Sequence, residues 1–237
     1  MKTLVLGDTH GLNYWKHAVT AENPDRVIFI GDYFDSFNIS TADQINNFLD
    51  IVEYKKTSTK EVVMLVGNHD IHYITGENGT SGYQRVGSYQ ICPVISDNIS
   101  HLQMAYRLED YLFTHAGVSS EFMDEVFKDW SIDTLVDQLN ELFIFKPKLF
   151  EFNGTDPYGD NTWQTPIWIR PRSLMKANRQ TLRQKFIQIV GHTQVRKLDL
   201  EGSKNAAGGR YYFIDCMQTS KEYLVISDGL SVGKVSS

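Results

Sequence analysis

Five apolar runs in this sequence each lead directly into aspartate, asparagine or histidine, and this repeat constrains the fold more than any other feature. The five segments are TLVLGDTHG with Asp8 and His10, VIFIGDYFD with Asp32, VVMLVGNHD with Asn68, YLFTHAG with His115, and IQIVGHTQ with His192. Each run has the length and aliphatic composition of a buried strand. Because open α/β folds place ligands at the carboxyl ends of their strands, the five strand ends can share one site.

The runs belong to a longer alternation of strands and helices. The predicted elements are strands at 3–7, 26–31 and 61–66 and helices at about 12–20 and 41–55. The second helix has an apolar stripe at i, i+3, i+4 and i+7, formed by Ile45, Phe48, Leu49 and Val52. We expect Thr41 to cap its start and the stripe to cover one face of a sheet. The alternation indicates layered βαβ construction.

Two looser regions interrupt this pattern, and we expect them to form the rim of the site. The first, at about 71–110, is rich in glycine and tyrosine. The second, at about 118–185, has predicted helices at 120–129, 132–144 and 173–185 around an aromatic and proline-rich loop at 145–172. At the end of the chain, RYYFIDCM and EYLVISDG predict two antiparallel strands joined by a turn near Thr219 and Ser220. We expect a single domain over residues 1–237.

The composition narrows the class of protein. With 237 residues and 41% hydrophobic content, the chain can bury one sizeable core. A formal net charge of -6 gives no basic field for a nucleic-acid backbone, so no stable nucleic-acid partner is expected. No apolar span is long enough for a transmembrane helix, and the first strand begins too early to leave room for a signal peptide. Cys92 and Cys216 are predicted buried free thiols, which suits a cytoplasmic protein.

The candidate ligands offer oxygen and imidazole nitrogen without sulfur. That set suits Mn, Fe, Zn, Ni or Mg. Asp8 and His10 are two residues apart, so they can face the same way where the chain leaves its strand. Asp32 is the natural bridge, because one carboxylate can hold two cations roughly 3.5 to 4 Å apart. The sequence therefore predicts a two-metal centre able to ionise a bridging water for phosphoryl transfer.

The motifs GDTHG, GDYFD, GNHD, THAG and GHT, in that order over residues 7–194, resemble the calcineurin-like metallophosphoesterase superfamily. Within it, GDTHG, GDYFD and HAG are similar to the phosphoprotein phosphatase branch, which also includes bacterial diadenosine tetraphosphatases. The resemblance implies a four-layer α/β/β/α sandwich, an α/β fold in which two mixed sheets are flanked by helices. It also implies two divalent ions, most readily Mn²⁺, with Fe, Zn, Ni or Mg as other choices.

The resemblance assigns a role to each motif residue. It implies that Asp8, His10 and Asp32 hold the first ion, and that Asp32, Asn68, His115 and His192 hold the second. His69 would face the substrate as a general acid or charge stabiliser, and Asp35 would be its partner. An ionised Asp35 bonded to one imidazole nitrogen would raise the pKa of His69, so that it can protonate a leaving alkoxide near neutral pH. Asp70 would support these residues from behind.

Two positions depart from the family's pattern. The last motif ends in Gln194, where many members have a histidine ligand, so Gln194 is only a doubtful ligand. The branch's phosphate-binding arginine after GDxxD is replaced by Ser36, so phosphate has to be bound by other cations. The candidates are Arg170 and Arg172 in PIWIRPRSL, with Arg85 as a second possibility. His17, His72 and His101 are interpreted as surface or packing residues, and the aromatic residues at 145–168 as packing of their own insertion.

Three functions follow from these motifs. The first is hydrolysis of phosphomonoesters, on phosphoproteins or small metabolites, by direct attack of a metal-bridging hydroxide. The second uses the same ions on dinucleoside polyphosphates or phosphodiesters, which makes a nucleotide a possible partner. The third is a scaffold without catalysis, which the nearly complete ligand set disfavours. In all three cases a phosphorylated ligand is expected and a membrane is not.

Overall fold

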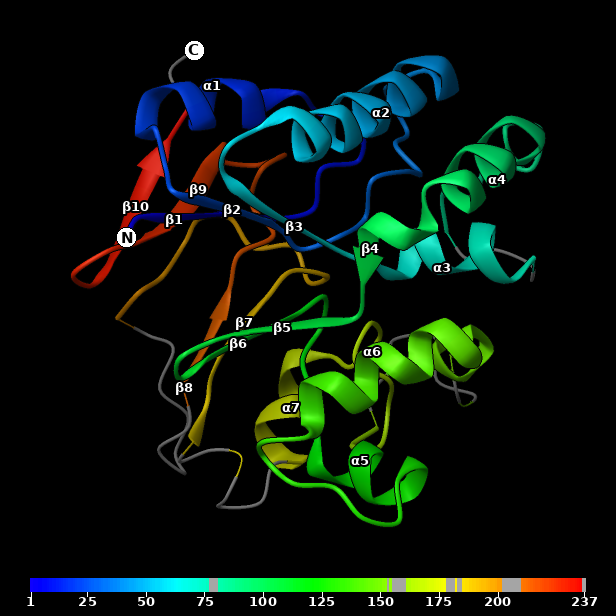
Figure 1. The fold of residues 1–237 in the computed structure, drawn as a ribbon, viewed down its shortest axis with the longest axis vertical. Helices are drawn as coiled ribbons and strands as arrows, with labels where there is room; N and C mark the ends of the chain where they lie inside the picture. Colours follow the sequence, from blue (N-terminus) through cyan, green and yellow to red (C-terminus); the bar gives the residue numbers. More distant parts are fainter. Residues whose placement is uncertain are drawn as a thin grey trace.

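Two β-sheets form the centre of the protein in this computed structural model (Figure 1). The structure describes residues 1–76, 81–152, 154, 161–177, 182, 185–201 and 210–235. The six-stranded sheet has the order β10-β9-β1-β2-β3-β4, with β1 Thr3–Leu6, β2 Arg26–Phe29, β3 Glu61–Leu65, β4 Leu102–Gln103, β9 Glu222–Ile226 and β10 Leu230–Lys234. The four-stranded sheet has the order β5-β6-β7-β8, with β5 Ala105–Leu108, β6 Tyr111–Thr114, β7 Ile187–Val190 and β8 Arg210–Phe213.

Both sheets are mixed, as the resemblance implies. In the larger sheet β1, β2, β3 and β4 run parallel, while β9 and β10 pair antiparallel. In the smaller sheet β6, β7 and β8 run parallel and β5 pairs antiparallel with β6. The parallel strands therefore end together, and each sheet has one edge at which the loops after its parallel strands meet.

The first strand shows why its sequence is continuously apolar. Leu4 and Leu6 pack in the core cluster that includes Trp15 and Phe48 from the helices α1 (Tyr14–Glu22) and α2 (Thr41–Thr57). Val5 packs in a second cluster, which holds residues of both sheets. Since both faces of the strand are buried, polar alternation is absent. Figure 1 shows α1 and α2 along the outer side of the larger sheet, and α5, α6 and α7 at the opposite side of the molecule.

Helix α2 begins where the sequence predicts, but its cap and its buried face differ. Ser40, not Thr41, is the N-cap, and its hydroxyl accepts a hydrogen bond from the backbone N–H of Asp43 at 3.2 Å. Leu49 is 39% exposed, whereas Asn47 is buried. Asn47 lies on the buried face, where its Oδ1 accepts a hydrogen bond from Trp15 Nε1 at 3.0 Å, while its buried Nδ2 has no hydrogen-bond partner among the described residues.

The prediction that RYYFIDCM and EYLVISDG pair with each other is wrong. Strand β8 pairs parallel with β7 in the smaller sheet, while β9 pairs with β1 and β10 in the larger one. A turn does lie near Thr219 and Ser220, where three successive backbone N–H groups up to Lys221 donate to the carbonyl of Cys216. This turn carries the chain from one sheet to the other. The only antiparallel hairpin at this end of the described chain is β9–β10.

The two interrupting regions contain most of the remaining helices. The first holds α3 Asn68–Thr75, α4 Ser88–Asp97 and the 3-10 helix η1 Ile99–His101, with strands β4 and β5 that the sequence did not indicate. The second holds α5 Ser120–Val126, α6 Leu135–Phe145, η2 Pro147–Phe150 and α7 Pro171–Ala177. Parts of the expected loop at 145–172 and helix at 173–185, namely 153, 155–160, 178–181, 183 and 184, lie outside the described residues, as do 77–80.

Two general expectations can be compared with the structure. Cys92 and Cys216 are both free, and Cys216 is buried whereas Cys92 is half-buried. Among the described residues, no helix combines the length and apolarity that crossing a bilayer requires.

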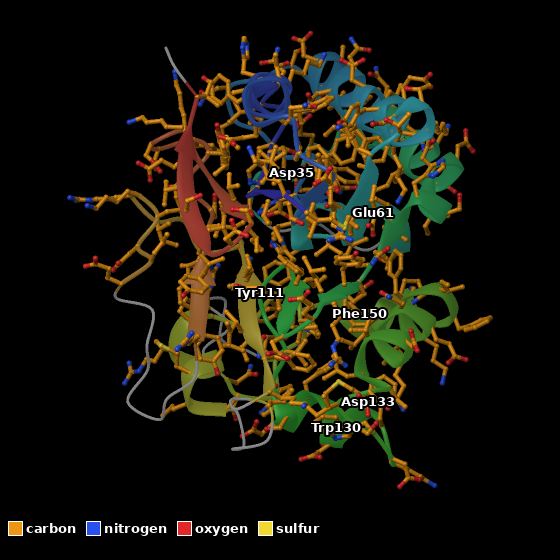
Figure 2. All side chains as sticks on the ribbon, turned by 60° about the vertical axis from the view of Figure 1, so that its left-hand side comes forward. Asp35, Glu61, Tyr111, Trp130, Asp133 and Phe150 are labelled. Carbon is orange, nitrogen blue, oxygen red and sulfur yellow. The ribbon has the colours of Figure 1, made fainter. Side chains whose placement is uncertain are left out.

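The connection between α5 and α6, which carries Trp130 and Asp133, lies at the opposite end of the molecule from Asp35 (Figure 2).

Candidate metal centre

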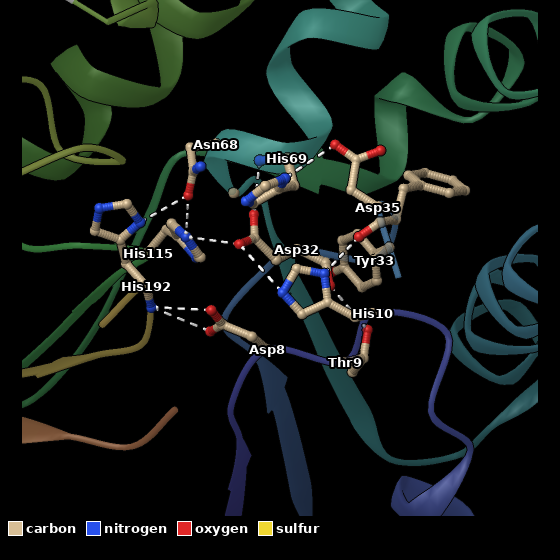
Figure 3. Close-up of polar contacts among 12 residues, drawn as sticks. Asp8, Thr9, His10, Asp32, Tyr33, Asp35, Asn68, His69, His115 and His192 are labelled. Carbon is tan, nitrogen blue, oxygen red and sulfur yellow. Dashed lines mark hydrogen bonds and ion pairs between the residues drawn. The ribbon is translucent and has the colours of Figure 1, made fainter. Parts of the chain in front are cut away.

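The residues that end the five apolar runs meet at one place (Figure 3). Asp8 follows β1, Asp32 follows β2, Asn68 follows β3, His115 follows β6 and His192 follows β7. Ligand atoms of Asp8, Asp32 and His115 all lie within 4.8 Å of one another, and the three residues are buried. The two sheets therefore deliver their parallel strand ends to a common point between them.

The other expected ligands lie close to Asp32 or to one another. Asn68 Oδ1 lies 2.9 Å from His115 Nε2 and 2.7 Å from His192 Nδ1. Asp32 Oδ2 lies 3.3 Å from His115 Nε2 and 3.8 Å from His10 Nε2. Figure 3 shows the Asp32 carboxylate between His10 on one side and His115 on the other. Asp32 therefore lies within ion-pair distance of His10 and of His115.

The hydrogen bonds of two imidazoles leave their inward nitrogens available for a cation. His115 Nδ1 lies 3.0 Å from the carbonyl of Ile30, and His10 Nδ1 lies 2.5 Å from the carbonyl of Phe34. A neutral ring that donates through Nδ1 carries a lone pair on Nε2. Nε2 of His115 and Oδ1 of Asn68 then face each other as two acceptors. A cation between them would satisfy both, so the residues present fit a metal ion.

The electrostatics of the centre point the same way. Burial, together with the charges of Asp215 and Asp32, raises the pKa of Asp8 well above its usual value. Burial also lowers the pKa of His10, and burial with His115 and Arg170 lowers that of His192 well below its usual value. These two imidazoles are therefore held neutral, as metal ligation requires. Packing carboxylates this closely without a cation is unfavourable.

The backbone at the site is strained in the way that functional sites often are. Seven described non-glycine residues have a positive φ, and four of them are predicted site residues: His10 at 42°, Asp32 at 53°, Asp35 at 66° and His192 at 62°. A left-handed conformation is uncommon for such residues and is kept where the surroundings over-determine it. Here it turns the side chains at the strand ends toward one another.

Two motif glycines make room for the carboxylates. A Cβ on Gly67 would lie 2.0 Å from Asp32 Oδ1, and a Cβ on Gly191 would lie 2.0 Å from Asp8 Oδ1. The Asp8 carboxylate also accepts the backbone N–H of His192 at 3.2 and 3.1 Å. The glycines of GNHD and GHT are thus required by close approach of a ligand side chain.

Asp70 holds the loop that carries Asp32. Its carboxylate accepts the backbone N–H groups of Asp32 at 2.8 Å, Gly67 at 2.9 Å and Tyr33 at 2.8 Å. Burial and the charge of Asp32 raise the pKa of Asp70 to about 7, against these hydrogen bonds. This contact set is the supporting role that the resemblance implied for the residue.

His69 lies beside the ligand groups with Asp35 as its partner. His69 Nδ1 is 2.9 Å from Asp35 Oδ2, and the backbone N–H of His69 donates to Asp32 Oδ1 at 2.8 Å. Burial alone would lower the pKa of His69, but the charges of Asp32 and Asp35 and the bond to Asp35 raise it to about 9. With Nδ1 at Asp35, the second N–H of the protonated ring is at Nε2.

Of the three candidate arginines, one faces the centre. Arg170 Nη1 donates to the carbonyl of His192 at 3.3 Å and to Thr193 Oγ1 at 3.2 Å. Burial lowers the pKa of Arg170, while the charges of Asp32, Asp8 and Asp215 oppose that shift. Arg172 and Arg85 are exposed.

The other candidates in these segments are Gln194 and the aromatic residues of the second insertion. Gln194 is exposed, and among the described residues it has no hydrogen bond to the ligand groups. Trp168, in the insertion with Arg170, is buried and packs edge-on against Phe152 and His192. Trp163 is 38% exposed, and Tyr158 lies outside the described residues.

Two residues at the centre escaped the sequence interpretation. Asp215 is buried just after β8, where burial and Asp32 raise its pKa to about 7. It ends a sixth apolar run, RYYFI, so the pattern that identified the other five segments also applies to it. His72 was interpreted as a surface or packing residue, yet it is buried with Nε2 2.9 Å from Asp35 Oδ2. Its i, i+3 spacing from His69 on one helix is too general to single it out from the sequence.

Comparison with known proteins agrees with this geometry. A family model described as calcineurin-like phosphoesterase matches residues 1–203. Among curated proteins, none matches the sequence of this chain significantly. Among solved structures, a cold-active protein-tyrosine phosphatase of a psychrophilic Shewanella species is similar with TM-score 0.67 and 15% identity, over 99% of this chain and 80% of that one.

A second similar structure is a protein serine/threonine phosphatase from Saccharomyces cerevisiae with similarity to human phosphatase PP5. Its TM-score is 0.62 and its identity 14%, over 100% of this chain and 81% of that chain. At these identities the likeness is one of fold.

Proposed function

Because the chain belongs to the calcineurin-like phosphoesterases, a family of metal-dependent hydrolases, we propose that it hydrolyses phosphomonoesters with two divalent ions. The observation that carries this proposal is the position of the Asp32 carboxylate between His10 and His115. Asp8, His10 and Asp32 would hold the first ion, and Asp32, Asn68, His115 and His192 the second. Two bound cations, Mn²⁺ as the first choice, would acidify a shared water and neutralise charge on the phosphoryl oxygens.

A side chain of the protein would protonate the leaving group. His69, with its pKa raised to about 9, is protonated at neutral pH and would give the Nε2 proton to the departing oxygen. Asp35 holds the ring through Nδ1 and stabilises its charged form. Asp32 adds to this orientation, because it accepts the backbone N–H of His69. The group that leaves as an alkoxide or phenoxide is thereby protonated as the bond to phosphorus breaks.

Arg170 is the candidate for binding the phosphate itself. Ser36 occupies the position at which the related phosphoprotein phosphatases carry an arginine, so the charge has to come from elsewhere. The guanidinium of Arg170 bonds to the carbonyl of His192 and to Thr193, and the charges of Asp32, Asp8 and Asp215 act on its pKa, which supports this role. A guanidinium fork can bind two non-bridging oxygens of a terminal phosphate. Both similar solved structures are phosphoprotein phosphatases by name, which favours a monoester as the substrate class.

We further propose that residues 1–237 form one cytoplasmic domain whose two insertions supply the rim of the site. Tyr83 and Gln84 from the first insertion contact the side chain of Tyr73, which bonds to Asp35. Trp168 and Arg170 from the second contact His192. Two free thiols are compatible with a reducing compartment.

The test is to remove metal, restore Mn²⁺, and compare p-nitrophenyl phosphate with bis-p-nitrophenyl phosphate. Asp32→Asn should lose metal and activity together, because both ligand groups lose a carboxylate. Asp133→Asn is the matched control, since Asp133 is 89% exposed and lies at the far end of the molecule (Figure 2). Faster turnover of the diester would favour a nucleotide hydrolase instead. A metal-loaded protein that hydrolyses neither compound would contradict the monoesterase proposal.

A further inference from the structure

The carboxylate of Asp35 is in contact with three side chains from one helix, α3. His69 Nδ1 and His72 Nε2 each lie 2.9 Å from Asp35 Oδ2, and the hydroxyl of Tyr73 donates to Asp35 Oδ1. The proposed reaction uses only the first of these contacts. The contacts of His72 and Tyr73 have no role in that reaction, although both side chains are buried and polar.

His72 is held in place by its surroundings. Its side chain is 5% exposed, and its ring meets Tyr73 and Tyr83 edge-on at centroid distances of 4.4 and 4.9 Å. Residues three and four apart on a helix share a face, so the residues at 69, 72 and 73 all reach Asp35. Figure 3 shows Asp35 beside the His69 ring, above the loop that carries Asp32 and Tyr33.

We propose that His72 and Tyr73 are positioning residues that fix the Asp35 carboxylate, and through it the orientation of the His69 ring toward the leaving group. This inference rests on the proposed phosphomonoesterase function. His72 Nε2 approaches the same carboxylate oxygen as His69 at ion-pair distance without hydrogen-bond geometry, while the hydroxyl of Tyr73 bonds to the other oxygen, so the carboxylate is contacted at both of its oxygens. With one contact only, the carboxylate could rotate and the ring would follow it.

Tyr73 also connects this cluster to the rim. Its hydroxyl accepts the backbone N–H of Gln84 at 3.1 Å, and its ring stacks on Tyr83 at 5.2 Å. Gln84 Nε2 donates in turn to the carbonyl of Ser36, next to Asp35. The hydroxyl of Tyr73 is thus fixed by a donor and an acceptor at once, and the rim segment helps to set the position of Asp35.

A role in positioning can be separated from a role in packing by the leaving group. His72→Phe keeps an aromatic ring and removes the nitrogen at Asp35, and Tyr73→Phe removes only the hydroxyl. Phe48→Leu is the control, because it loosens the neighbouring aromatic packing through Phe34, which contacts Tyr73, and leaves the contacts to Asp35 in place. Each variant is loaded with Mn²⁺ and assayed with p-nitrophenyl phosphate and with phenyl phosphate, whose phenol is less acidic and needs a proton more.

We expect kcat for phenyl phosphate to fall by about tenfold in His72→Phe and in Tyr73→Phe, a fraction of what a general acid contributes. For p-nitrophenyl phosphate kcat should stay within about twofold, and Phe48→Leu should leave the ratio of the two rates unchanged. Adding His72→Phe to Asp35→Asn should cost nothing further, because both changes act through the same carboxylate.

The second readout needs no turnover. In ¹⁵N-histidine-labelled protein, the N–H proton of His69 Nδ1 should give a low-field resonance that Asp35→Asn removes and His72→Phe shifts. Equal losses for both substrates, or additive losses with Asp35→Asn, would overturn the positioning role while the wild-type activity upholds the proposed function. If the wild type shows no metal-dependent turnover, the proposed function fails and this inference fails with it.

Discussion

One of the two equally close approaches at the candidate centre yields a sharp prediction, the effect of Gly191→Ala. A methyl group at this position would lie 2.0 Å from Asp8 Oδ1 and 3.1 Å from Ile30 Cγ2. Non-bonded contacts start at about 3.5 Å, so the Asp8 carboxylate has to move by more than about 1 Å. No positive φ is involved at Gly191, so the whole effect comes from space.

The magnitude follows from what Asp8 does. A displacement of about 1 Å in a catalytic group can reduce the rate by about 100-fold, and a metal ligand that moves this far also loses its bond. We therefore expect kcat/KM for p-nitrophenyl phosphate to fall by about 100-fold or more. Metal content after Mn²⁺ loading should drop toward one ion per chain, because Asp32, Asn68, His115 and His192 are left in place. Overpacking should reduce the stability of the metal-free protein by only about 1–3 kcal/mol.

Elemental analysis, steady-state kinetics and denaturant unfolding measure these three quantities. Gly229→Ala is the matched control, because a Cβ at Gly229 would meet no atom within 4 Å. The reasoning would be refuted if Gly191→Ala bound two ions and turned over substrate as fast as Gly229→Ala does. A variant that fails to fold would point to the backbone rather than to Asp8, and circular dichroism of the metal-free protein distinguishes that case.

Three further predictions address the other parts of the site. His69→Asn should keep its metal but lose about 10²- to 10⁴-fold in kcat for phenyl phosphate, so metal loss would contradict the role assigned to it. Arg170→Ala should lower kcat/KM by about 10²- to 10³-fold, whereas Arg172→Ala, at an exposed position, should change it little; equal effects would exclude Arg170 as the phosphate ligand. The metal-free protein should become less stable in urea as the pH rises from about 4 to about 7. Asp8, Asp70 and Asp215 have folded pKa values above 3.8, about 7 for the last two, and these three carboxyl groups outnumber His10 and His192, whose lowered pKa values act in the opposite direction; over that range the folded state therefore binds more protons than the unfolded one. Stability that instead increases over this range would show that other groups dominate.

The ligand residues could be predicted from the sequence because each signal is local. Asp8, Asp32, Asn68, His115 and His192 each end their own apolar run, and the run alone identifies a buried strand. Parallel strands then bring their ends together without any knowledge of which strand neighbours which. The order β10-β9-β1-β2-β3-β4 was not needed for that inference.

The pairing of the last strands could not be predicted in the same way. Strands β8 and β9 are both short, apolar and separated by a turn, a pattern that is typical of a hairpin. Their true partners, β7 and β1, belong to two different sheets, and β1 lies at the opposite end of the chain from β9. The same error concealed Asp215, since a residue inside a terminal hairpin is not expected at the carboxyl edge of the smaller sheet.

His72 shows why positioning residues are harder to recognise than ligands. Its contact with Asp35 depends on the register of α3, which begins at Asn68, and on the left-handed turn at Asp35 itself. Neither feature leaves a pattern in the chain, because any residue three positions after His69 would be placed on the same face. A ligand is identified by the strand that it ends, whereas a positioning residue is identified only by the atom that it touches. The motifs of this chain therefore define a phosphoesterase, while the positioning that we propose for His69 depends on residues that follow the motif.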